Sequence, residues 1–285
     1  MSIRTIGVIN PGAMGVTVGA SIKAGGSRVI WASADRSKAT RDRADKAGLE
    51  DIGSLSGLVS SSDVIISVCP PHAAVDVAQE VIRIGFDGIY TDVNAVSPAT
   101  ARKIMKIVTS SKAGYVDGGI IGPPAHEPGR TRLYLSGQQA DKIEPLFAKG
   151  NMDAIIIGEE PGAASALKMC YAAWTKGSSA MLLAIRALAE AEGVSKALIN
   201  EWSKSQPGLE ARSEAAASGA APKAWRFVGE MEEIASTFKE AGLPDLFHLG
   251  AAAIYKKLGR FKDQTGSIQL QHVISELNNK SSEPG

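Results

Sequence analysis

The nine residues GVINPGAMG, at positions 7–15, follow an apolar, β-branched run and open a stretch of good helix formers. A G-x-G-x-x-G turn between a strand and a helix lets the backbone approach a pyrophosphate, which rests on the helix N-terminus. Asn10 replaces the first glycine, and asparagine tolerates the left-handed backbone of such a turn better than most residues. The alternative is a glycine-rich turn that binds nothing. In this setting the motif predicts dinucleotide contacts from Asn10, Pro11, Gly12, Ala13 and Met14.

Short strands and helices alternate along the first half of the chain. Strands are predicted at 3–9, 28–31, 63–68 and 88–92, and helices at 13–24, 37–47, 72–84 and 97–108. Later strands are predicted at 115–121, 131–135 and 154–157, with a helix at 139–149. This alternation predicts βαβ units in a doubly wound parallel sheet, because parallel strands need a crossover connection. The first half is therefore predicted to be an α/β Rossmann domain.

The pattern changes after Gly162. Residues 164–191 are a long run of good helix formers, and beyond them we predict only helices. Breaks are expected near Gly193, Pro207, Pro222 and Pro244. We predict an NADP-binding Rossmann domain over 1–160 and an all-α substrate and dimerisation domain over 161–285. The long helix either opens the second domain or connects the two.

The composition is that of an ordinary soluble globular protein. Of 285 residues, 44% are hydrophobic and 21% charged, with a formal net charge of +1, so we expect neither nucleic acid nor a membrane as the main partner. A cytoplasmic location is expected, because no apolar run reaches about 18 residues and no signal peptide is recognised. We expect reduced thiols at Cys69 and Cys170, and no metal, because no His/Cys/Asp cluster has ligand spacing.

The end of the second predicted strand bears on cofactor choice. NAD enzymes usually carry an acid there for the ribose hydroxyls. Here Ser33, Arg36 and Ser37 form a set that can hold a 2′-phosphate by charge-assisted hydrogen bonds, which favours NADP(H) over NAD(H). Asp35 argues the other way, unless it caps the following helix.

After the strand at 63–68, the sequence Val-Cys-Pro-Pro-His places Cys69 and Pro70 where a cofactor ribose and nicotinamide pass. The two prolines fix an extended turn. A reactive thiol is the alternative for Cys69, but no activating partner stands nearby in the sequence, which favours a structural thiol.

Four motifs in order resemble those of the 6-phosphogluconate dehydrogenase and β-hydroxyacid dehydrogenase superfamily. They are GVINPGAMG at 7–15, DVNAVSP at 92–98, DGGIIGPP at 117–124 and GAASALKM at 162–169. The resemblance covers the whole chain and implies hydride transfer between nicotinamide and an alcohol or carbonyl, in a homodimer joined through the helical domains. The family's catalytic lysine falls on Lys168, as general acid/base. Small and apolar neighbours disfavour the alternative, a solvated helix-face lysine.

The same resemblance assigns other contacts. Asn94 and Ser97 match a polar loop that contacts nicotinamide ribose and substrate, although both are also good helix-capping residues. The backbone at Gly118 and Gly119 is expected beside the nicotinamide. If Lys168 is not catalytic, the alternative function is a non-catalytic NADP-binding sensor.

Three departures from the family pattern concern the substrate. The Ser-Gly-Gly triplet that holds a carboxylate is replaced by Ile121-Gly122-Pro123, and proline has no N–H to donate. The asparagine one turn after the lysine falls on Ala172, and a Lys-Asp pair is replaced within 230–233. A bulkier or less acidic alcohol, ketone or imine is therefore favoured. The substrate contacts that we predict are Ser97, Gly118, Gly119, Ile121, Tyr171, Trp174, Glu230 and His248, with Pro123 nearby.

Two features of the helical half keep alternative interpretations. Arg226, Glu230 and Glu233 share one helix face, as a site or as an amphipathic helix with an internal salt bridge, and Trp225 beside them can stack on substrate or partner. His248 is a second acid/base or a core histidine.

Overall fold

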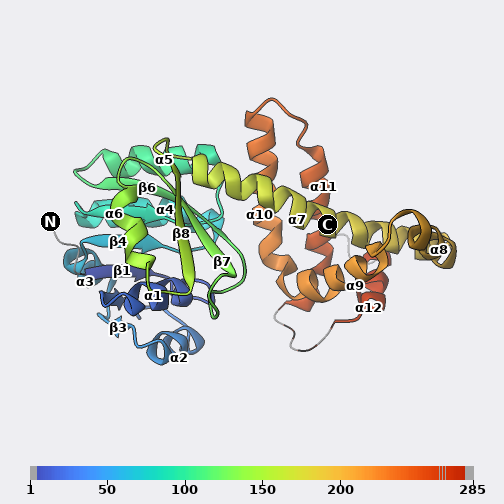
Figure 1. Cartoon of the computed structure of the whole chain (residues 1–285), viewed down its shortest axis with the longest axis horizontal. Helices are drawn as coiled ribbons and strands as arrows, with labels where there is room; N and C mark the ends of the chain where they lie inside the picture. Colours follow the sequence, from blue (N-terminus) through green and yellow to red (C-terminus); the bar gives the residue numbers. More distant parts are fainter. Residues whose placement is uncertain (1–4, 263, 265, 267, 280–285) are drawn as a thin grey trace. The chain divides into compact units, whose positions relative to one another are not determined.

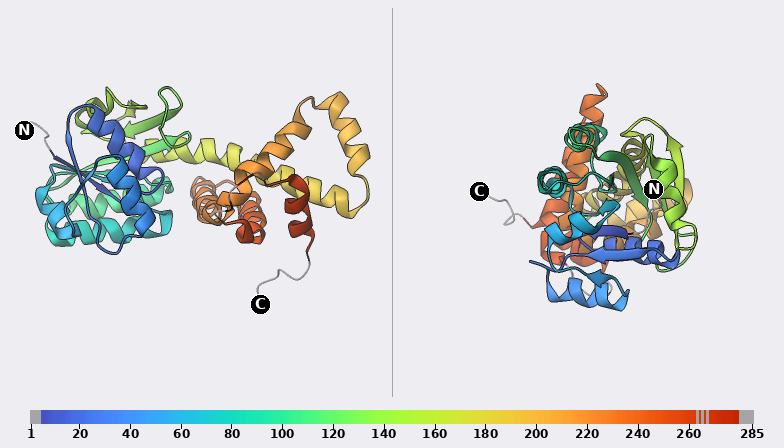
Figure 2. Two further views of the ribbon diagram at one scale, coloured as in Figure 1. Left: turned by 90° about the horizontal axis from the view of Figure 1, so that it is seen from below. Right: turned by 90° about the vertical axis from the view of Figure 1, so that its left-hand side faces the viewer.

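The computed structural model describes residues 5–262, 264, 266 and 268–279. The chain divides into two compact units, Met1–Met169 and Cys170–Gly285, and the division falls inside one helix, α7 (Ala163–Ala191). The first unit holds the sheet, and the described part of the second is helical (Figures 1 and 2).

The first unit is built on one eight-stranded sheet of order β3-β2-β1-β4-β5-β6-β7-β8. The strands are β1 (Thr5–Ile9), β2 (Arg28–Trp31), β3 (Glu50–Asp51), β4 (Val64–Ser67), β5 (Ile89–Asp92), β6 (Gly114–Ile121), β7 (Thr131–Ser136) and β8 (Met152–Gly158). This confirms the predicted doubly wound fold, with one correction: β7 runs antiparallel to β6. The loop between them is too short for a parallel crossover, which needs about a dozen residues or more.

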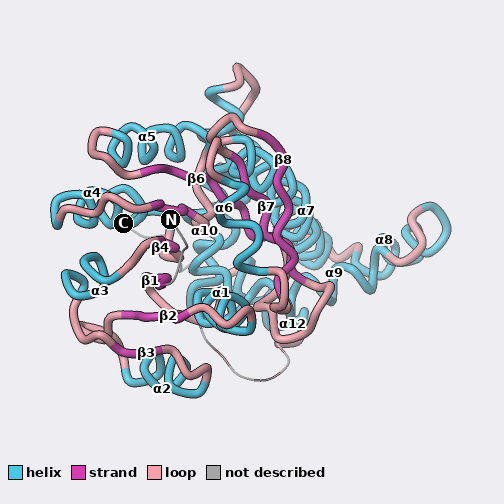
Figure 3. Tube along the Cα trace, turned by 60° about the vertical axis from the view of Figure 1, so that its left-hand side comes forward, coloured by secondary structure: helices cyan, strands magenta, loops and turns pink. Residues whose placement is uncertain are grey.

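Helices cover both faces of this sheet (Figure 3). They are α1 (Gly15–Ala24), α2 (Lys38–Lys46), α3 (Leu55–Ser61), α4 (Ala74–Ile84), α5 (Pro98–Thr109) and the short α6 (Ala140–Ile143), with 3₁₀ turns at Pro71–Ala73 and Glu144–Phe147. One core packs α1 against β1 and β6, through residues such as Val18 and Ile120, and the other packs α3, α4 and α5 against the opposite face. The helix predicted at 139–149 is interrupted, because Pro145 lacks the N–H that an α-helix needs.

Strand register brings three polar residues to the carboxyl edge of the sheet. Ser67 pairs with Asp92, and Asp92 pairs with Asp117, so Asp117 lies level with the ends of β4 and β5, while β6 continues beyond it to Ile121. In doubly wound sheets, ligands bind outside this edge. The sheet therefore aligns the loops from which the candidate site is built.

The second unit continues α7 and adds α8 (Ser195–Ser205), α9 (Leu209–Ala220), α10 (Ala224–Glu240), α11 (Leu246–Lys257) and α12 (Leu270–Asn278), with 3₁₀ turns at Ala221–Lys223 and Leu258–Phe261. Each predicted break falls between helices. Phe238 and His248 bring α10 and α11 together, with ring centroids 4.2 Å apart. Over the described residues, no helix is long and apolar enough to cross a membrane.

Candidate active site

The turn between β1 and α1 has the geometry of a dinucleotide-binding turn. Asn10 has φ of 60°, the left-handed conformation that the first position requires. A Cβ on Gly15 would lie 2.4 Å from the Asn10 carbonyl oxygen, so only glycine lets α1 begin this close to the strand. A Cβ on Gly12, in contrast, would meet nothing nearer than 4.0 Å. The turn is tight against protein at Gly15 and open at Gly12.

The N-terminus of α1 is suited to an anion. Met14 stands at its N-cap and makes no side-chain cap hydrogen bond, so the first-turn amides are not covered by a capping side chain. Ala13 is exposed, whereas Pro11 is buried and braces the turn. The Asn10 Oδ1 atom is buried and has no partner among the described residues. These features fit a pyrophosphate resting on α1.

The loop after β2 is organised around Ser37, whose Oγ accepts a hydrogen bond from the Thr40 amide at 3.3 Å and caps α2. Asp35 therefore does not cap this helix, which corrects that alternative: its φ of 58° places it in the preceding turn. Arg36 forms no ion pair with any described carboxylate, and it is exposed. The Arg36 amide donates to the Ser33 carbonyl at 3.1 Å, so Ser33 and the residue that carries this guanidinium share one turn, as a 2′-phosphate site needs.

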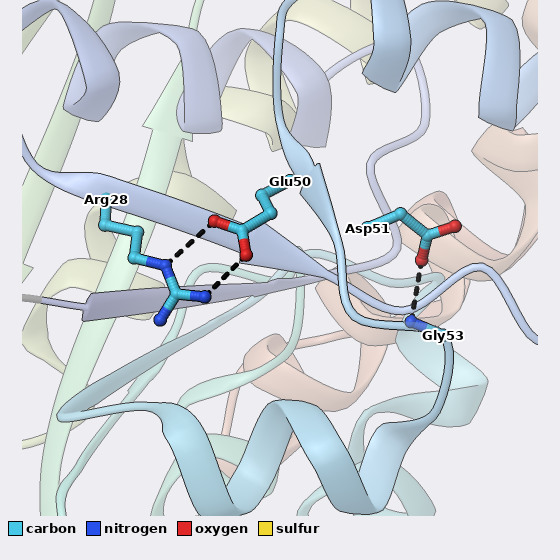
Figure 4. A network of polar contacts seen from close by, with 4 residues as sticks. All are labelled: Arg28, Glu50, Asp51 and Gly53. Carbon is cyan, nitrogen blue, oxygen red and sulfur yellow. Dashed lines mark hydrogen bonds and ion pairs between the residues drawn. The ribbon is translucent and has the colours of Figure 1, made fainter.

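Two further residues hold this loop, and sequence reasoning missed both. Arg41 donates from Nη2 to the Ser33 carbonyl and from Nε to the Arg36 carbonyl, each at 3.3 Å. The Asp51 carboxylate accepts a hydrogen bond from the Ser33 amide at 3.1 Å. It also accepts one from the Gly53 amide at 2.8 Å (Figure 4). Burial alone would raise the pKa of Asp51, but these hydrogen bonds bring it below its ordinary value. The only sequence signal for these contacts was Arg41 itself, a basic residue one turn into α2.

A bidentate ion pair fixes the edge strand that carries Asp51. Arg28 of β2 donates from Nε and Nη2 to the Glu50 carboxylate of β3, at 2.8 and 2.5 Å (Figure 4). A strand of only two residues has few ladder hydrogen bonds of its own. The pair therefore helps to keep Asp51 under the Ser33 loop.

The loops after β4 and β5 are tied together by Asn94. Its Oδ1 accepts from the Cys69 amide at 2.5 Å, its Nδ2 donates to Ser67 Oγ at 3.2 Å, and its own amide donates to Asp92 Oδ1 at 3.0 Å. Asn94 is 3% exposed. It thus positions the Cys69–Pro70 backbone rather than presenting a free amide. The Cys69 thiol is half-buried, and burial together with Asp92 raises its pKa to about 12, which disfavours a thiolate.

Ser97 is the N-cap of α5, as its capping alternative predicted. Its Oγ accepts from the Thr100 amide at 3.2 Å and donates to Thr100 Oγ1 at 2.9 Å. The side chain is buried, with 1% exposed. Its hydroxyl proton is therefore used within the helix cap.

Asp117, in the middle of β6, fixes the start of α7. Its carboxylate accepts from the amides of Gly162 and Ser165 and from the hydroxyls of Ser165 and Ser136, at 2.6 to 3.0 Å. Burial raises the pKa of Asp117, and these hydrogen bonds oppose that shift. Asp117 is the first residue of the DGG motif, but nothing in the local sequence indicates that it caps a distant helix.

Lys168 lies on the first turns of α7, packed against β6. Its Nζ donates to the Ile120 carbonyl at 2.6 Å, and the residue is partly buried. A Cβ on Gly119 would lie 2.6 Å from the Ala164 carbonyl oxygen and 3.0 Å from Lys168 Cβ, so this glycine lets the helix approach the strand. A Cβ on Gly118 would lie 2.6 Å from Val93 Cγ1, so this glycine makes room for the residue that follows β5. Ile121 is buried. The lysine is held by its strand, not solvated on a helix face.

The predicted residues of the helical unit separate into two environments. Tyr171 and Trp174 are exposed on α7. Glu230 Oε2 pairs with Lys176 Nζ of α7 at 2.8 Å, which corrects the internal salt bridge, because Arg226 instead lies over the Trp225 ring. His248 is buried between phenyl rings, and burial lowers its pKa.

Comparison with known proteins agrees with this geometry. The nucleotide-binding domain of prephenate dehydrogenase matches residues 18–133, and a domain of unknown function, DUF1932, matches residues 189–258. An uncharacterized 28.5 kDa protein of Methanothermus fervidus is 35% identical over 159 residues, 56% of this chain. The matched segment spans 61% of that relative's length.

Solved structures of the same architecture cover nearly the whole chain. The conserved protein MTH1747, described as similar to 3-hydroxyacid dehydrogenases, is 26% identical with a TM-score of 0.67, covering 90% of this chain and 97% of that one. The 3-hydroxyisobutyrate dehydrogenase of Mycobacterium tuberculosis, solved with L-serine, is 17% identical with a TM-score of 0.72, covering 97% and 100%. A reductive aminase of Aspergillus terreus, solved with NADPH and ethyl levulinate, is 17% identical with a TM-score of 0.57, covering 96% and 99%. These likenesses confirm the predicted resemblance and fold class.

Proposed function

We propose that the chain is a divergent β-hydroxyacid dehydrogenase-like protein, an NADP(H)-dependent oxidoreductase that acts on an alcohol or carbonyl with Lys168 as general acid/base. The observation that carries this proposal is the Lys168 amine, held 2.6 Å from the Ile120 carbonyl on a partly buried helix start. Asp117 places that helix start through three hydrogen bonds, from the amides of Gly162 and Ser165 and from the Ser165 hydroxyl. A fixed position of the lysine amine is expected where a general acid must deliver its proton to one atom of the substrate.

The residues that would hold the cofactor lie in three loops of the first unit. The open backbone at Gly12 and the α1 amides suit the pyrophosphate, while Ser33 and Arg36 suit a 2′-phosphate. Cys69 and Pro70, positioned by Asn94, supply backbone for the nicotinamide ribose. The nicotinamide, when bound, supplies or accepts the hydride. Arg36 favours NADP(H), because a phosphate would give its unpaired guanidinium a partner.

Lys168 moves the proton. Its Nζ donates to the substrate oxygen or nitrogen as a carbonyl or imine is reduced, and it takes a proton from the hydroxyl in the reverse direction. The Ile120 carbonyl accepts one of its three N–H bonds and so fixes where the amine lies. A small residue at Gly119 keeps this distance short.

The substrate is proposed to be weakly acidic or neutral at the position where relatives hold a carboxylate. Pro123 offers no amide, and its carbonyl accepts from Thr131 Oγ1 at 2.6 Å, which locks the turn. Gly122 has φ of 126°, and a Cβ there would lie 2.4 Å from the Arg130 carbonyl oxygen. This turn presents apolar surface instead of an anion cradle, which supports a second candidate function, ketone or imine reduction.

Turnover tests the proposal. Purified protein with NADPH or NADP⁺ is assayed on hydroxyacids, aryl alcohols, ketones and cyclic imines, by following NADPH absorbance. We expect consumption of NADPH with a ketone or cyclic imine, and consumption slower by about 10²–10⁴-fold in Lys168→Met. Tight NADPH binding with no turnover across the whole panel would instead support a non-catalytic NADP-binding sensor.

We also propose that the active form is a homodimer joined through the helical unit. Leu246 and Phe247 of α11 are 75% and 47% exposed, and with Met181 of α7 they line an apolar groove of about 280 Å³. Apolar side chains of this size at one surface are typical of protein–protein contact sites. A second copy of the chain is the occupant that the resemblance implies.

A further inference from the structure

The helical unit contains a second pocket, of about 380 Å³, which the proposed chemistry does not use. It lies among α7, α9, α10 and α11, and Ala215, Ala216 and Gly219 of α9 leave the space open. This volume lies in the range of small-molecule sites, roughly 300–1,000 Å³. The pocket is therefore large enough for a ligand of about ten non-hydrogen atoms.

The charged residues that line it are both cationic, Lys176 and Arg212. Lys176 is already neutralised by Glu230, at 2.8 Å, and lies 4.9 Å over the Phe227 ring. Arg212 is exposed, forms no ion pair with a described carboxylate, and lies 5.8 Å from the Trp174 ring centroid. One positive charge is thus left uncompensated at a largely apolar pocket.

A second guanidinium, that of Arg186, contacts α9 but does not line the pocket. Arg186 of α7 donates from Nη1 to Ser213 Oγ at 2.9 Å, directly beside Arg212 in sequence. Its Nε is buried and has no partner among the described residues. The lining therefore holds two cations, and Glu230 is the carboxylate paired with one of them, Lys176.

Two of the three hydroxyls of the α7 wall, those of Thr175 and Ser179, already donate within the helix, and Ser178 carries the third. Thr175 Oγ1 donates to the Tyr171 carbonyl at 3.1 Å, and Ser179 Oγ donates to the Thr175 carbonyl at 2.9 Å. Their protons are used inside the helix. The charged donor for an anion is Arg212, whose planar guanidinium can bind a carboxylate with two parallel hydrogen bonds.

We propose that this pocket binds a small organic anion, a carboxylate joined to an apolar body. Arg212 binds the carboxylate, while Leu182, Ala216 and Phe227 contact the apolar body. The carboxylate belongs either to a separate effector or to the far end of the substrate, and the chemistry of recognition is the same for both.

Binding of benzoate to the full-length protein tests the pocket, with benzyl alcohol as the uncharged comparison, by isothermal titration. The test variant is Arg212→Gln. Arg226→Gln is a matched control, because Arg226 is also exposed and lies 5.8 Å from a tryptophan ring, Trp225, but does not line the pocket. We expect Arg212→Gln to weaken benzoate binding about 10-fold or more and Arg226→Gln to leave it unchanged. Added salt is expected to weaken binding in the wild type.

Equal binding of benzoate and benzyl alcohol, or equal loss in the two variants, would overturn the proposal. This arm needs no turnover, so it is independent of the reductase activity. A second arm compares KM for an oxo acid and its methyl ester. A rise in KM for the oxo acid alone in Arg212→Gln assigns the anion to the substrate, and an unchanged KM with lost benzoate binding assigns it to an effector.

Discussion

Asp117 of β6 accepts a hydrogen bond from the Ser165 hydroxyl of α7, 2.6 Å from its Oδ1, across 48 positions of sequence. The same carboxylate accepts from the Ser165 amide at 2.9 Å. The start of α7 is therefore capped by a strand residue instead of by its own neighbour. Because Lys168 lies one turn further on, the position of its amine depends on this contact.

Asp117→Asn tests that dependence. An amide has one acceptor oxygen where the carboxylate has two, so some of the four donors lose their partner. We expect the free energy of unfolding to fall by about 1.5–3 kcal/mol, measured by urea denaturation. Asp153→Asn, at an exposed position of β8, is the control and is expected to change little. A native stability in Asp117→Asn would contradict the capping role.

Arg36→Ala tests the proposed cofactor choice. Only NADPH has a 2′-phosphate to lose, so NADPH is expected to bind about 10- to 100-fold more weakly, with NADH binding nearly unchanged. Fluorescence titration with both cofactors measures this. Arg43→Ala serves as the control, because Arg43 is exposed and bonds Thr40 on the same helix. An equal loss for both cofactors, or a wild-type preference for NADH, would exclude NADP(H) specificity through Arg36.

Lys168→Met tests the acid/base assignment. Removal of the amine is expected to lower kcat by about 10²–10⁴-fold while NADPH affinity and the fold are retained. Because the interaction is made mainly in the transition state, kcat and kcat/KM are expected to fall together. The pH profile of the wild type is expected to carry a limb that the variant lacks. Near-native kcat in the variant would leave Lys168 with a structural role only.

His248 gives the helical unit a pH dependence. Burial lowers its pKa below the ordinary 6.5, so below that pH the unfolded chain binds a proton that the folded chain resists. The free energy of unfolding is therefore expected to fall as the pH drops through 6.5 toward the lowered pKa, and to be constant above it. Urea denaturation of wild type and His248→Leu across about pH 5–8 measures the difference between the two curves. A difference independent of pH would contradict burial of a neutral histidine.

Phe247→Asp tests the proposed dimer. A carboxylate in an apolar interface is costly to desolvate, so the variant is expected to be monomeric at a concentration where the wild type is dimeric. Light scattering after size exclusion measures the mass. Glu240→Asp, exposed on α10, is a conservative control. A wild-type protein that is monomeric at all concentrations would contradict the proposal directly.

The sheet and the long helix were predictable because their signals are local. Alternating β-branched runs and the turn at 7–15 placed β1, β2, β4 and β5 within about two residues. The two-residue strand β3 and the helix α3 were missed, because neither is long enough to show a period. The reversed direction of β7 is not encoded in the strand's own residues; its sequence signal is the loop at 122–130, which is too short for a parallel crossover.

The candidate site could be predicted from the sequence only at positions where a single residue within a local motif has the proposed role. The turn at Asn10 and the partly buried Lys168 were recognised from their motifs. Arg41, Asp51 and Asp117 act on groups far away in the sequence, and no local pattern reports such contacts. The Glu230 error has the same origin: helix spacing offered Arg226 as a partner, whereas tertiary packing supplied Lys176.

The division of the chain inside α7, between Met169 and Cys170, has a consequence for recombination. Asp117, Ser165 and Lys168 lie on the same side of it and would be inherited together by a chimera joined there. A junction at residue 160 would separate the lysine from the carboxylate that places it. Exchange of helical halves between homologues is therefore expected to preserve acid/base chemistry only when the crossover lies after Lys168.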